Sequence, residues 1–213
     1  MNAITNDDLI AILGKMADDL EAAKDYLGEL DAAVGDGDQG VTMTIGFRAI
    51  RDVLPSLKGQ DAGTIIARAG MTFNGKAAST IGALIATAGM RAGKEVKGKT
   101  EIDLADLVKM VDAAIVGIKE RGKADVGDKT VLDMLAPTLA SLQSSVAEDL
   151  SLAEALKRSV AAAEAGAKST IPMKSKIGRA SWLADRTVGH QDPGATSFYL
   201  MWKSMAEYVI GQE

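Results

Sequence analysis

The chain has 213 residues, 47% of them hydrophobic and 25% charged, which is the size and composition of one globular domain. Its formal net charge of -5 argues against nucleic acid as a main partner, and the absence of cysteine excludes disulfides and thiolate metal sites. No apolar run approaches the about 18 residues that a membrane helix needs, and the acidic start lacks the basic residues of a secretory signal, so we expect a cytoplasmic protein without membrane contact.

The first half of the chain predicts four helices. Apolar residues from Leu9 to Leu30 alternate in spacings of four and three, which places them on one helical stripe. The stripe ends at the glycine-rich run GDGDQG, residues 35–40. A second helix is predicted over residues 41–54 with Pro55 as its stop, a third around residues 65–71 and a fourth over the alanine-rich residues 83–92.

The second half predicts four more helices. The run TEID at residues 100–103 is typical of a helix start, GDKT at residues 127–130 precedes another helix, and SLAE at residues 151–154 is a capping box. Residues 170–196 are irregular, and a last helix is predicted over residues 197–210. No segment alternates with a two-residue period, so we expect a single all-α domain over residues 1–213 with about eight helices and no sheet.

Three aspartates lie where the first predicted helix gives way to the glycine-rich run: Asp31, Asp36 and Asp38. The glycines allow a sharp turn that can bring the three carboxylates together. Clustered carboxylates repel unless a cation lies between them, and hard oxygen ligands favour magnesium or calcium. Helix-capping and turn roles are the alternative interpretation, because aspartate and glycine are common in both.

Two known loops are excluded by the residues at their key positions. An EF-hand beginning at Asp36 needs glycine at its sixth position and glutamate at its twelfth, where the chain has Val41 and Phe47. The run GMTFNGKA at residues 70–77 is one residue from a P-loop, but Ala77 has no hydroxyl for magnesium and the preceding segment is predicted as helix rather than strand. We expect a turn between helices here, with Gly75 just after a helix end.

A basic segment lies late in the chain. Residues 168–186 carry five cationic side chains and a single acid, against the sign of the chain as a whole. A solvated loop is one interpretation of this segment. The other is that Arg179 neutralises phosphate oxygens opposite the metal, which a guanidinium can do with two parallel hydrogen bonds. Phosphoryl transfer requires little beyond metal, a cationic group and positioning.

Six short motifs in register resemble those of one family. They are AVGDGDQG at residues 33–40, GMT at 70–72, RGKA at 121–124, GDKT at 127–130, GRAS at 178–181 and GHQDPGATS at 189–197. On these motifs the chain resembles the nucleotide-binding L subunit of dihydroxyacetone kinases. The resemblance implies a barrel of eight antiparallel helices with the nucleotide at one end.

The resemblance also implies a set of site residues. It assigns two Mg²⁺ ions to Asp31, Asp36 and Asp38, and it places Arg179 near the transferred phosphoryl group as the catalytic residue. The nucleotide-contacting positions that it implies are Gln39, Gly40, Val41, Thr42, Thr80, Ile81, Gly122, Arg179, Asp192, Pro193 and Gly194.

The implied reaction transfers a phosphoryl group from Mg-bound nucleotide to a short ketose, such as dihydroxyacetone, held covalently on a separate K subunit. The donor is either ADP retained as a cofactor and rephosphorylated by a phosphocarrier M subunit, or ATP exchanged at each turnover. Gln39 leaves this open, because the phosphotransferase-system branch often has histidine at that position. The alternative function is a nucleotide-sensing module that regulates a partner protein. Such a module would not need both the metal cluster and Arg179.

Overall fold

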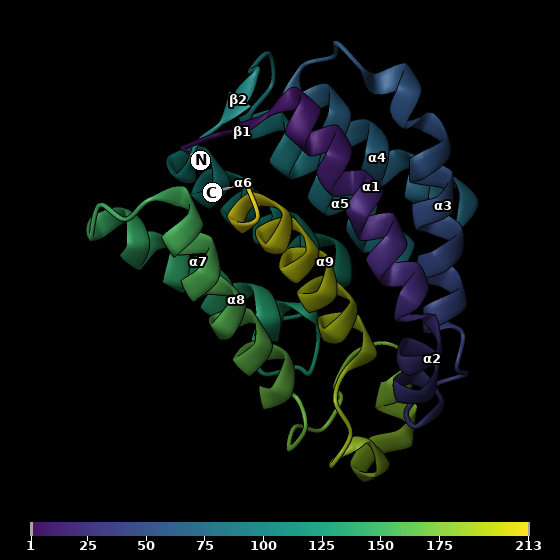
Figure 1. The fold of residues 1–213 in the computed structure, drawn as a ribbon. Helices are drawn as coiled ribbons and strands as arrows, with labels where there is room; N and C mark the ends of the chain where they lie inside the picture. Colours follow the sequence, from purple (N-terminus) through teal and green to yellow (C-terminus); the bar gives the residue numbers. More distant parts are fainter. Residues whose placement is uncertain (1, 213) are drawn as a thin grey trace.

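The computed structural model describes residues 2–212, apart from the side chain of Arg179. Within that range the chain forms nine α-helices and one 3-10 helix (Figure 1): α1 (Asn6–Ala22), α2 (Lys24–Ala32), α3 (Gln39–Leu57), α4 (Ala62–Lys76), α5 (Thr80–Glu95), α6 (Leu104–Gly122), α7 (Val131–Ala147), α8 (Leu152–Ser169), η1 (Arg179–Thr187) and α9 (Pro193–Ile210). The predicted all-α class is confirmed. Its one departure within residues 2–212 is a short antiparallel pair, β1 (Ile4–Thr5) and β2 (Glu101–Ile102), with Ile4 opposite Ile102.

The first predicted helix is divided at Ala23 into α1 and α2. Backbone hydrogen bonds continue across the division, because the Ala23 amide donates to Asp19 O and the Leu27 amide donates to Ala23 O, each at 3.0 Å. Leu20 and Leu27, on either side of the division, are both fully buried. The apolar stripe therefore faces the core along both helices, as its spacing predicts.

Two predicted helix ends are wrong. Helix α3 runs past Pro55 to Leu57, because a proline in the last turn removes only one hydrogen bond of the helix, while Leu57 gains a buried position. Gly75 does not follow a helix end but lies inside α4, whose last residue is Lys76. The exclusion of a P-loop is confirmed, since most of the run that resembles one is helical.

Two predicted helix starts are also displaced. Helix α6 is capped by Asp103 in a capping box with Asp106, while Glu101, which we placed in the capping segment, lies in β2. Helix α9 begins at Pro193 rather than at residue 197, and the Asp192 side chain caps it. Aspartate at the cap followed by proline at the first helical position is a strong start signal. The last four residues of the segment expected to be irregular are therefore the first turn of α9.

The long helices contact one another in chain order from α3 to α9, and α9 also packs against α1, which contacts α3. Small residues allow some of these helices to approach closely. A Cβ atom on Gly63 of α4 would lie 2.3 Å from the carbonyl oxygen of Gly93 on α5. Between α3 and α4, Gly46 leaves room for the ring of Phe73, which meets Phe47 edge to face with 5.5 Å between ring centroids. The barrel arrangement itself stays a prediction.

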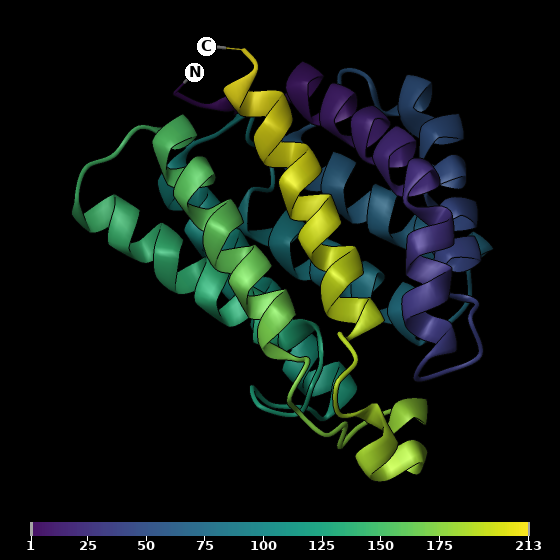
Figure 2. The same ribbon diagram turned by 60° about the horizontal axis from the view of Figure 1, so that its bottom comes forward.

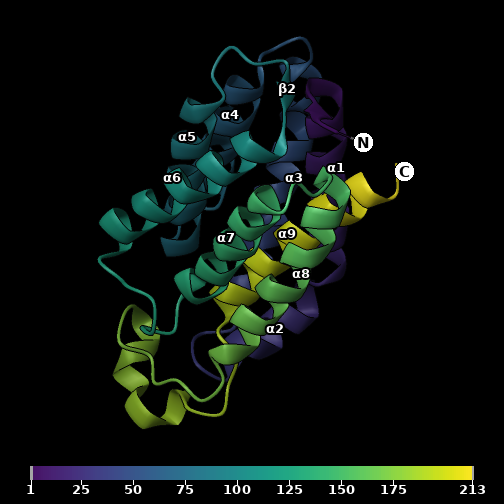
Figure 3. The same ribbon diagram turned by 90° about the vertical axis from the view of Figure 1, so that its left-hand side faces the viewer.

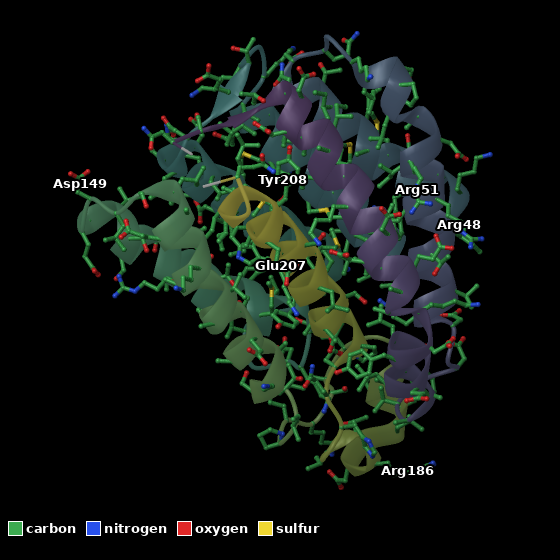
Figure 4. All side chains as sticks on the ribbon, in the orientation of Figure 1. Arg48, Arg51, Asp149, Arg186, Glu207 and Tyr208 are labelled. Carbon is green, nitrogen blue, oxygen red and sulfur yellow. The ribbon has the colours of Figure 1, made fainter. Side chains whose placement is uncertain are left out.

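The two ends of the molecule differ. The strands, the start of α1 and the end of α9 lie at one end, whereas η1, α2 and the start of α9 lie at the other (Figures 1 and 2). A view from the side shows the same separation (Figure 3), and the labelled Arg186 and Tyr208 mark the two ends (Figure 4). No helix in the described part of the chain is long and apolar enough to cross a membrane.

Candidate functional site

Two cavities of about 220 Å³ each differ sharply in chemistry. One lies among the long helices and is lined by apolar side chains and glycines. The other lies at the η1 end and is lined by charged, polar and apolar residues: Asp31, Val34, Gly35, Asp36, Asp38, Gln39, Thr42, Ser79, Thr80, Ile81, Leu84, Ile118, Gly122, Ala124, Lys129, Thr130, Val131, Ile177, Gly178, Ala180, Asp192, Pro193 and Gly194. The second cavity, called the polar pocket below, is the candidate site because it contains the groups that bind and orient a polar ligand.

Four helices begin at the polar pocket. Its lining includes residues from the first turns of α3, α5, α7 and α9. Helix N-termini carry partial positive charge and amide groups without helical partners, so they favour phosphate and other anions. The cap side chains of α5, α7 and α9 accept backbone hydrogen bonds, whereas Asp38, at the cap position of α3, makes no side-chain cap hydrogen bond.

The three aspartates identified in the sequence come together at one side of this pocket. Asp31 is in the last turn of α2, and Asp36 and Asp38 lie on the loop before α3. One carboxylate oxygen from each lies within 4.8 Å of the others. Gly35 makes this possible, since a Cβ atom there would lie 2.6 Å from Asp31 Oδ1. Three carboxylates at this separation repel one another strongly, and a hard divalent cation would offset the repulsion.

Gln39 ties the acidic cluster to α9. Its backbone amide donates to Asp31 Oδ2 at 3.2 Å, and its side-chain Nε2 donates to Ser197 Oγ at 2.8 Å. Ser197 Oγ in turn donates to the carbonyl oxygen of Pro193, also at 2.8 Å. The first residue of α3 is thus hydrogen-bonded both to a carboxylate of the cluster and to the first helical turn of α9.

Asp192 is the most perturbed acid of the pocket. Burial raises the pKa of its carboxyl group to about 6, opposed by the hydrogen bond from the Ala195 amide and by the charge of Lys129. The charges of Asp133 and Asp31 raise the pKa further. Asp192 as a whole residue is partly exposed to solvent, whereas its carboxyl group is buried. A perturbed acid in a polar cavity is a recurring feature of functional sites.

Most of the predicted nucleotide positions line the polar pocket: Gln39, Thr42, Thr80, Ile81, Gly122, Asp192, Pro193 and Gly194. Gly40 and Val41 are not among its lining residues. Gly40 packs against α2, where a Cβ atom would lie 1.9 Å from the carbonyl oxygen of Lys24, and the side chain of Val41 is exposed. The side chain of Arg179 lies outside the described part of the structure, although its neighbours Gly178 and Ala180 line the pocket.

The structure adds a cation that the sequence did not single out. Lys129 lines the pocket, yet its side chain is buried. Its place in the GDKT run, directly before the cap residue of α7, was the available signal. Two lysines of the basic segment are instead paired with acids, Lys174 with Asp185 at 2.9 Å and Lys176 with Asp128 at 3.0 Å.

Residues 33–207, most of the chain, match the DAK2 domain family. The chain belongs to this family. The resemblance to the L subunit of dihydroxyacetone kinases is confirmed by relatives of similar length. The ADP-binding subunit DhaL of the PEP-dependent dihydroxyacetone kinase of Escherichia coli strain K12 is 35% identical over 204 residues, covering 96% of this chain and 97% of that protein. The DhaL subunit of kinase 2 of Listeria innocua is 36% identical over 198 residues, 92% of this chain and 91% of its own length.

The chain also matches about a third of the length of longer kinases. The D-erythrulose kinase of Mycolicibacterium smegmatis is 36% identical over 200 residues, which are 91% of this chain and 34% of that kinase. The crystal structure of the dihydroxyacetone kinase of C. freundii aligns with 93% of this chain at a TM-score of 0.72 and 27% identity, and the match covers 34% of its chain. The same kinase in complex with AMP-PNP and Mg²⁺ aligns at a TM-score of 0.68.

Proposed function

We propose that this DAK2 domain is the nucleotide-binding subunit of a dihydroxyacetone-type kinase and holds ADP or ATP in the polar pocket. One observation carries the proposal: three carboxylates within 4.8 Å of one another lie in a cavity where four helices begin. Carboxylates provide the hard oxygen ligands that Mg²⁺ prefers, and helix N-termini favour phosphate. The same pocket therefore contains the groups for both parts of a magnesium nucleotide.

Each group of the pocket has a proposed role. Asp31, Asp36 and Asp38 would hold two Mg²⁺ ions, which would supply positive charge to offset that of the phosphates. The first turns of α3, α5 and α9 contact the nucleotide, with Thr42, Thr80 and Gly194 at the pocket wall. Arg179 is proposed to stabilise the transferred phosphoryl group. Its position between two pocket-lining residues, Gly178 and Ala180, supports this role.

The acceptor is proposed to be a short ketose held on a separate K subunit. The full-length similarity to ADP-binding subunits of PEP-dependent kinases supports ADP as a retained cofactor, rephosphorylated by a phosphocarrier M subunit. The similarity to a dihydroxyacetone kinase whose structure contains AMP-PNP, an analogue of ATP, and Mg²⁺ supports ATP as the exchanged donor. Native mass spectrometry separates the two, because a retained ADP with two Mg²⁺ survives purification as added mass.

A direct test combines binding and transfer. Wild-type chain should bind Mg·ADP in calorimetry, and with a K subunit, dihydroxyacetone and Mg·ATP or a phosphocarrier it should yield ketose phosphate. Asp36→Ala should lose both activities, whereas Asp112→Ala, on the exposed face of α6, should keep them. Transfer at the wild-type rate by Asp36→Ala would refute the metal assignment. Nucleotide binding by the wild type without transfer under any donor would favour the nucleotide-sensing alternative.

A further inference from the structure

Lys129 combines two unusual features. Lys129 is only 2% exposed, although lysine is rarely buried, and the Asp192 carboxylate is the acid whose charge acts on it. The backbone of Lys129 has φ of +62°, in the left-handed region that residues other than glycine seldom adopt. Backbone strain of this kind persists where the surrounding structure enforces it and is often associated with function.

The ammonium group of Lys129 is satisfied by backbone carbonyls. Four carbonyl oxygens lie within hydrogen-bond distance of its Nζ: those of Thr170 at 2.9 Å, Met173 at 3.1 Å, Thr187 at 2.7 Å and His190 at 2.5 Å. Because an ammonium group has three N–H donors, at least one of them is shared between two of these acceptors. Two of the four acceptors precede residues 174–186 and two follow them. The Lys129 side chain therefore holds both ends of residues 174–186. These residues are called the η1 segment below, because they include most of η1.

Other hydrogen bonds join the same two ends. The Gly189 amide donates to the carbonyl oxygen of Ile171 at 2.8 Å, and the Ser175 amide donates to Thr187 Oγ1 at 3.0 Å. The Asp192 amide donates to Thr170 Oγ1 at 2.9 Å, which connects this junction to the cap of α9. Lys129 links this junction to α7, because it directly precedes the Thr130 cap. Asp128 adds a second link, since its carbonyl oxygen accepts from the Lys176 amide at 3.3 Å.

We propose that Lys129 is a positioning residue that holds the η1 segment against the wall of the polar pocket. Gly178 and Ala180 of this segment line the pocket, and Arg179 lies between them. The start of α9, which supplies Asp192, Pro193 and Gly194 to the pocket, follows directly after the junction. The expected effect of Lys129 on phosphoryl transfer rests on the proposed function. Its expected effect on the η1 segment concerns the protein without any ligand.

A general contribution of Lys129 to folding is the competing explanation. It predicts loss of stability spread over the whole domain. The positioning role predicts a local effect, because the four acceptors lie between residues 170 and 190 and the long helices have their own core. Hydrogen exchange resolves such local opening from global unfolding.

The first test measures amide exchange by mass spectrometry without nucleotide or metal. Lys129→Met keeps an unbranched side chain one atom shorter than lysine and removes the ammonium group with all of its donors. We expect exchange in residues 171–192 to accelerate by on the order of tenfold or more, the scale of a lost hydrogen bond to a charged group, with α1 and α4 unchanged. Lys157→Met, an exposed lysine of α8, is the matched control. Unchanged or uniformly accelerated exchange would overturn the proposal.

The absence of cysteine permits a chemical rescue. Lys129→Cys would be the sole thiol, so it can be alkylated in the unfolded chain and refolded. Aminoethylation rebuilds a lysine-like ammonium, whereas propylation gives the same length with a methyl group in its place. Slow exchange in residues 171–192 should return with the aminoethyl group and not with the propyl group. Equal behaviour of the two products would overturn the role of the ammonium group. If both products fail to refold, the comparison of Lys129→Met with Lys157→Met decides alone.

The second test compares binding with transfer. In Lys129→Met, ketose phosphate formation should fall by about a hundredfold, the scale of a small misplacement of a reacting group. The Kd for Mg·ADP should rise less, because among the proposed nucleotide contacts only the start of α9 adjoins the Lys129 junction, whereas the acidic cluster and the first turns of α3 and α5 do not. Equal losses in binding and transfer would contradict a positioning role. If the wild type binds no ADP, the proposed function fails, while the exchange result still decides whether Lys129 holds the segment.

Discussion

Gln39 and Ser197 are 158 positions apart in the sequence, yet Gln39 Nε2 donates a 2.8 Å hydrogen bond to Ser197 Oγ in the interior of the protein. Both residues are buried, with 8% and 0% of their surfaces exposed. The backbone amide of Gln39 also donates to the Asp31 carboxylate. The Gln39–Ser197 pair therefore connects the acidic cluster to α9, the helix that begins at Pro193. The geometry of the cluster and that of α9 are therefore coupled.

Removing the serine hydroxyl should expose this coupling. Ser197→Ala leaves the side-chain amide of Gln39 buried without its acceptor. We therefore expect a loss of about 1–3 kcal/mol in the free energy of unfolding, measured by urea denaturation. Ser56→Ala, an exposed serine near the end of α3, should change stability by less than about 0.5 kcal/mol. A smaller loss when Gln39→Met is combined with Ser197→Ala than the sum of the single losses would confirm the pairing.

Removing the metal should show whether the three aspartates bind a magnesium nucleotide or serve only as capping and turn residues. ADP with Mg²⁺ at about a hundred times the Kd should stabilise the fold by about 3 kcal/mol, a rise in Tm of about 5–10 °C for a domain of this size. ADP with EDTA should leave Tm at the value of the free protein. If ADP raised Tm equally with and without EDTA, Asp31, Asp36 and Asp38 would be capping and turn residues only.

The long helices were predictable because their signals are local. The apolar stripe of α1 and α2 and the capping box of Ser151 with Glu154 depend only on residues a few positions apart. The convergence of Asp31, Asp36 and Asp38 was predictable for the same reason, since Gly35 and Gly37 lie between them. Local spacing is sufficient where the structure is made by neighbouring residues.

The remaining features depend on contacts distant in sequence. The role of Lys129 is set by carbonyl groups 41 to 61 positions away, which no local pattern records. The β1–β2 pair joins segments almost a hundred residues apart and is too short to show an alternating pattern. The continuation of α3 past Pro55 depends on burial of Leu57 against other helices. Tertiary packing, rather than propensity, decides each of these cases.

Asp192 should make the stability of the metal-free protein depend on pH. Its folded-state pKa of about 6 lies above the ordinary value of 3.8, so the folded state binds the proton more tightly than the unfolded state. Its contribution to stability is therefore present below about pH 4 and is lost as pH rises through about 6. Because Asp192 is partly exposed, we expect its contribution to the free energy of unfolding to be only about 2 kcal/mol.

The measurement is urea denaturation in EDTA at several pH values between 4 and 7.5. Asp192→Asn keeps an acceptor for the Ala195 amide but cannot titrate. Relative to wild type, this variant should gain about 2 kcal/mol as pH rises across the interval. A constant difference between the two proteins over the whole range would show that the Asp192 carboxyl group is not perturbed.

The close approach of α4 and α5 should be sensitive to a single methyl group. Gly63→Ala places a Cβ atom 2.3 Å from the carbonyl oxygen of Gly93 and 2.7 Å from Lys97 Cα, and these backbone atoms cannot move unless the chain itself shifts. We expect a loss of about 1–3 kcal/mol or more in the free energy of unfolding. Gly75→Ala, in the same helix, meets no atom within 4 Å and should gain about 0.5–1 kcal/mol from reduced freedom of the unfolded chain. Urea denaturation of both variants measures the difference, and a neutral Gly63→Ala would mean that the two helices do not pack this closely in solution.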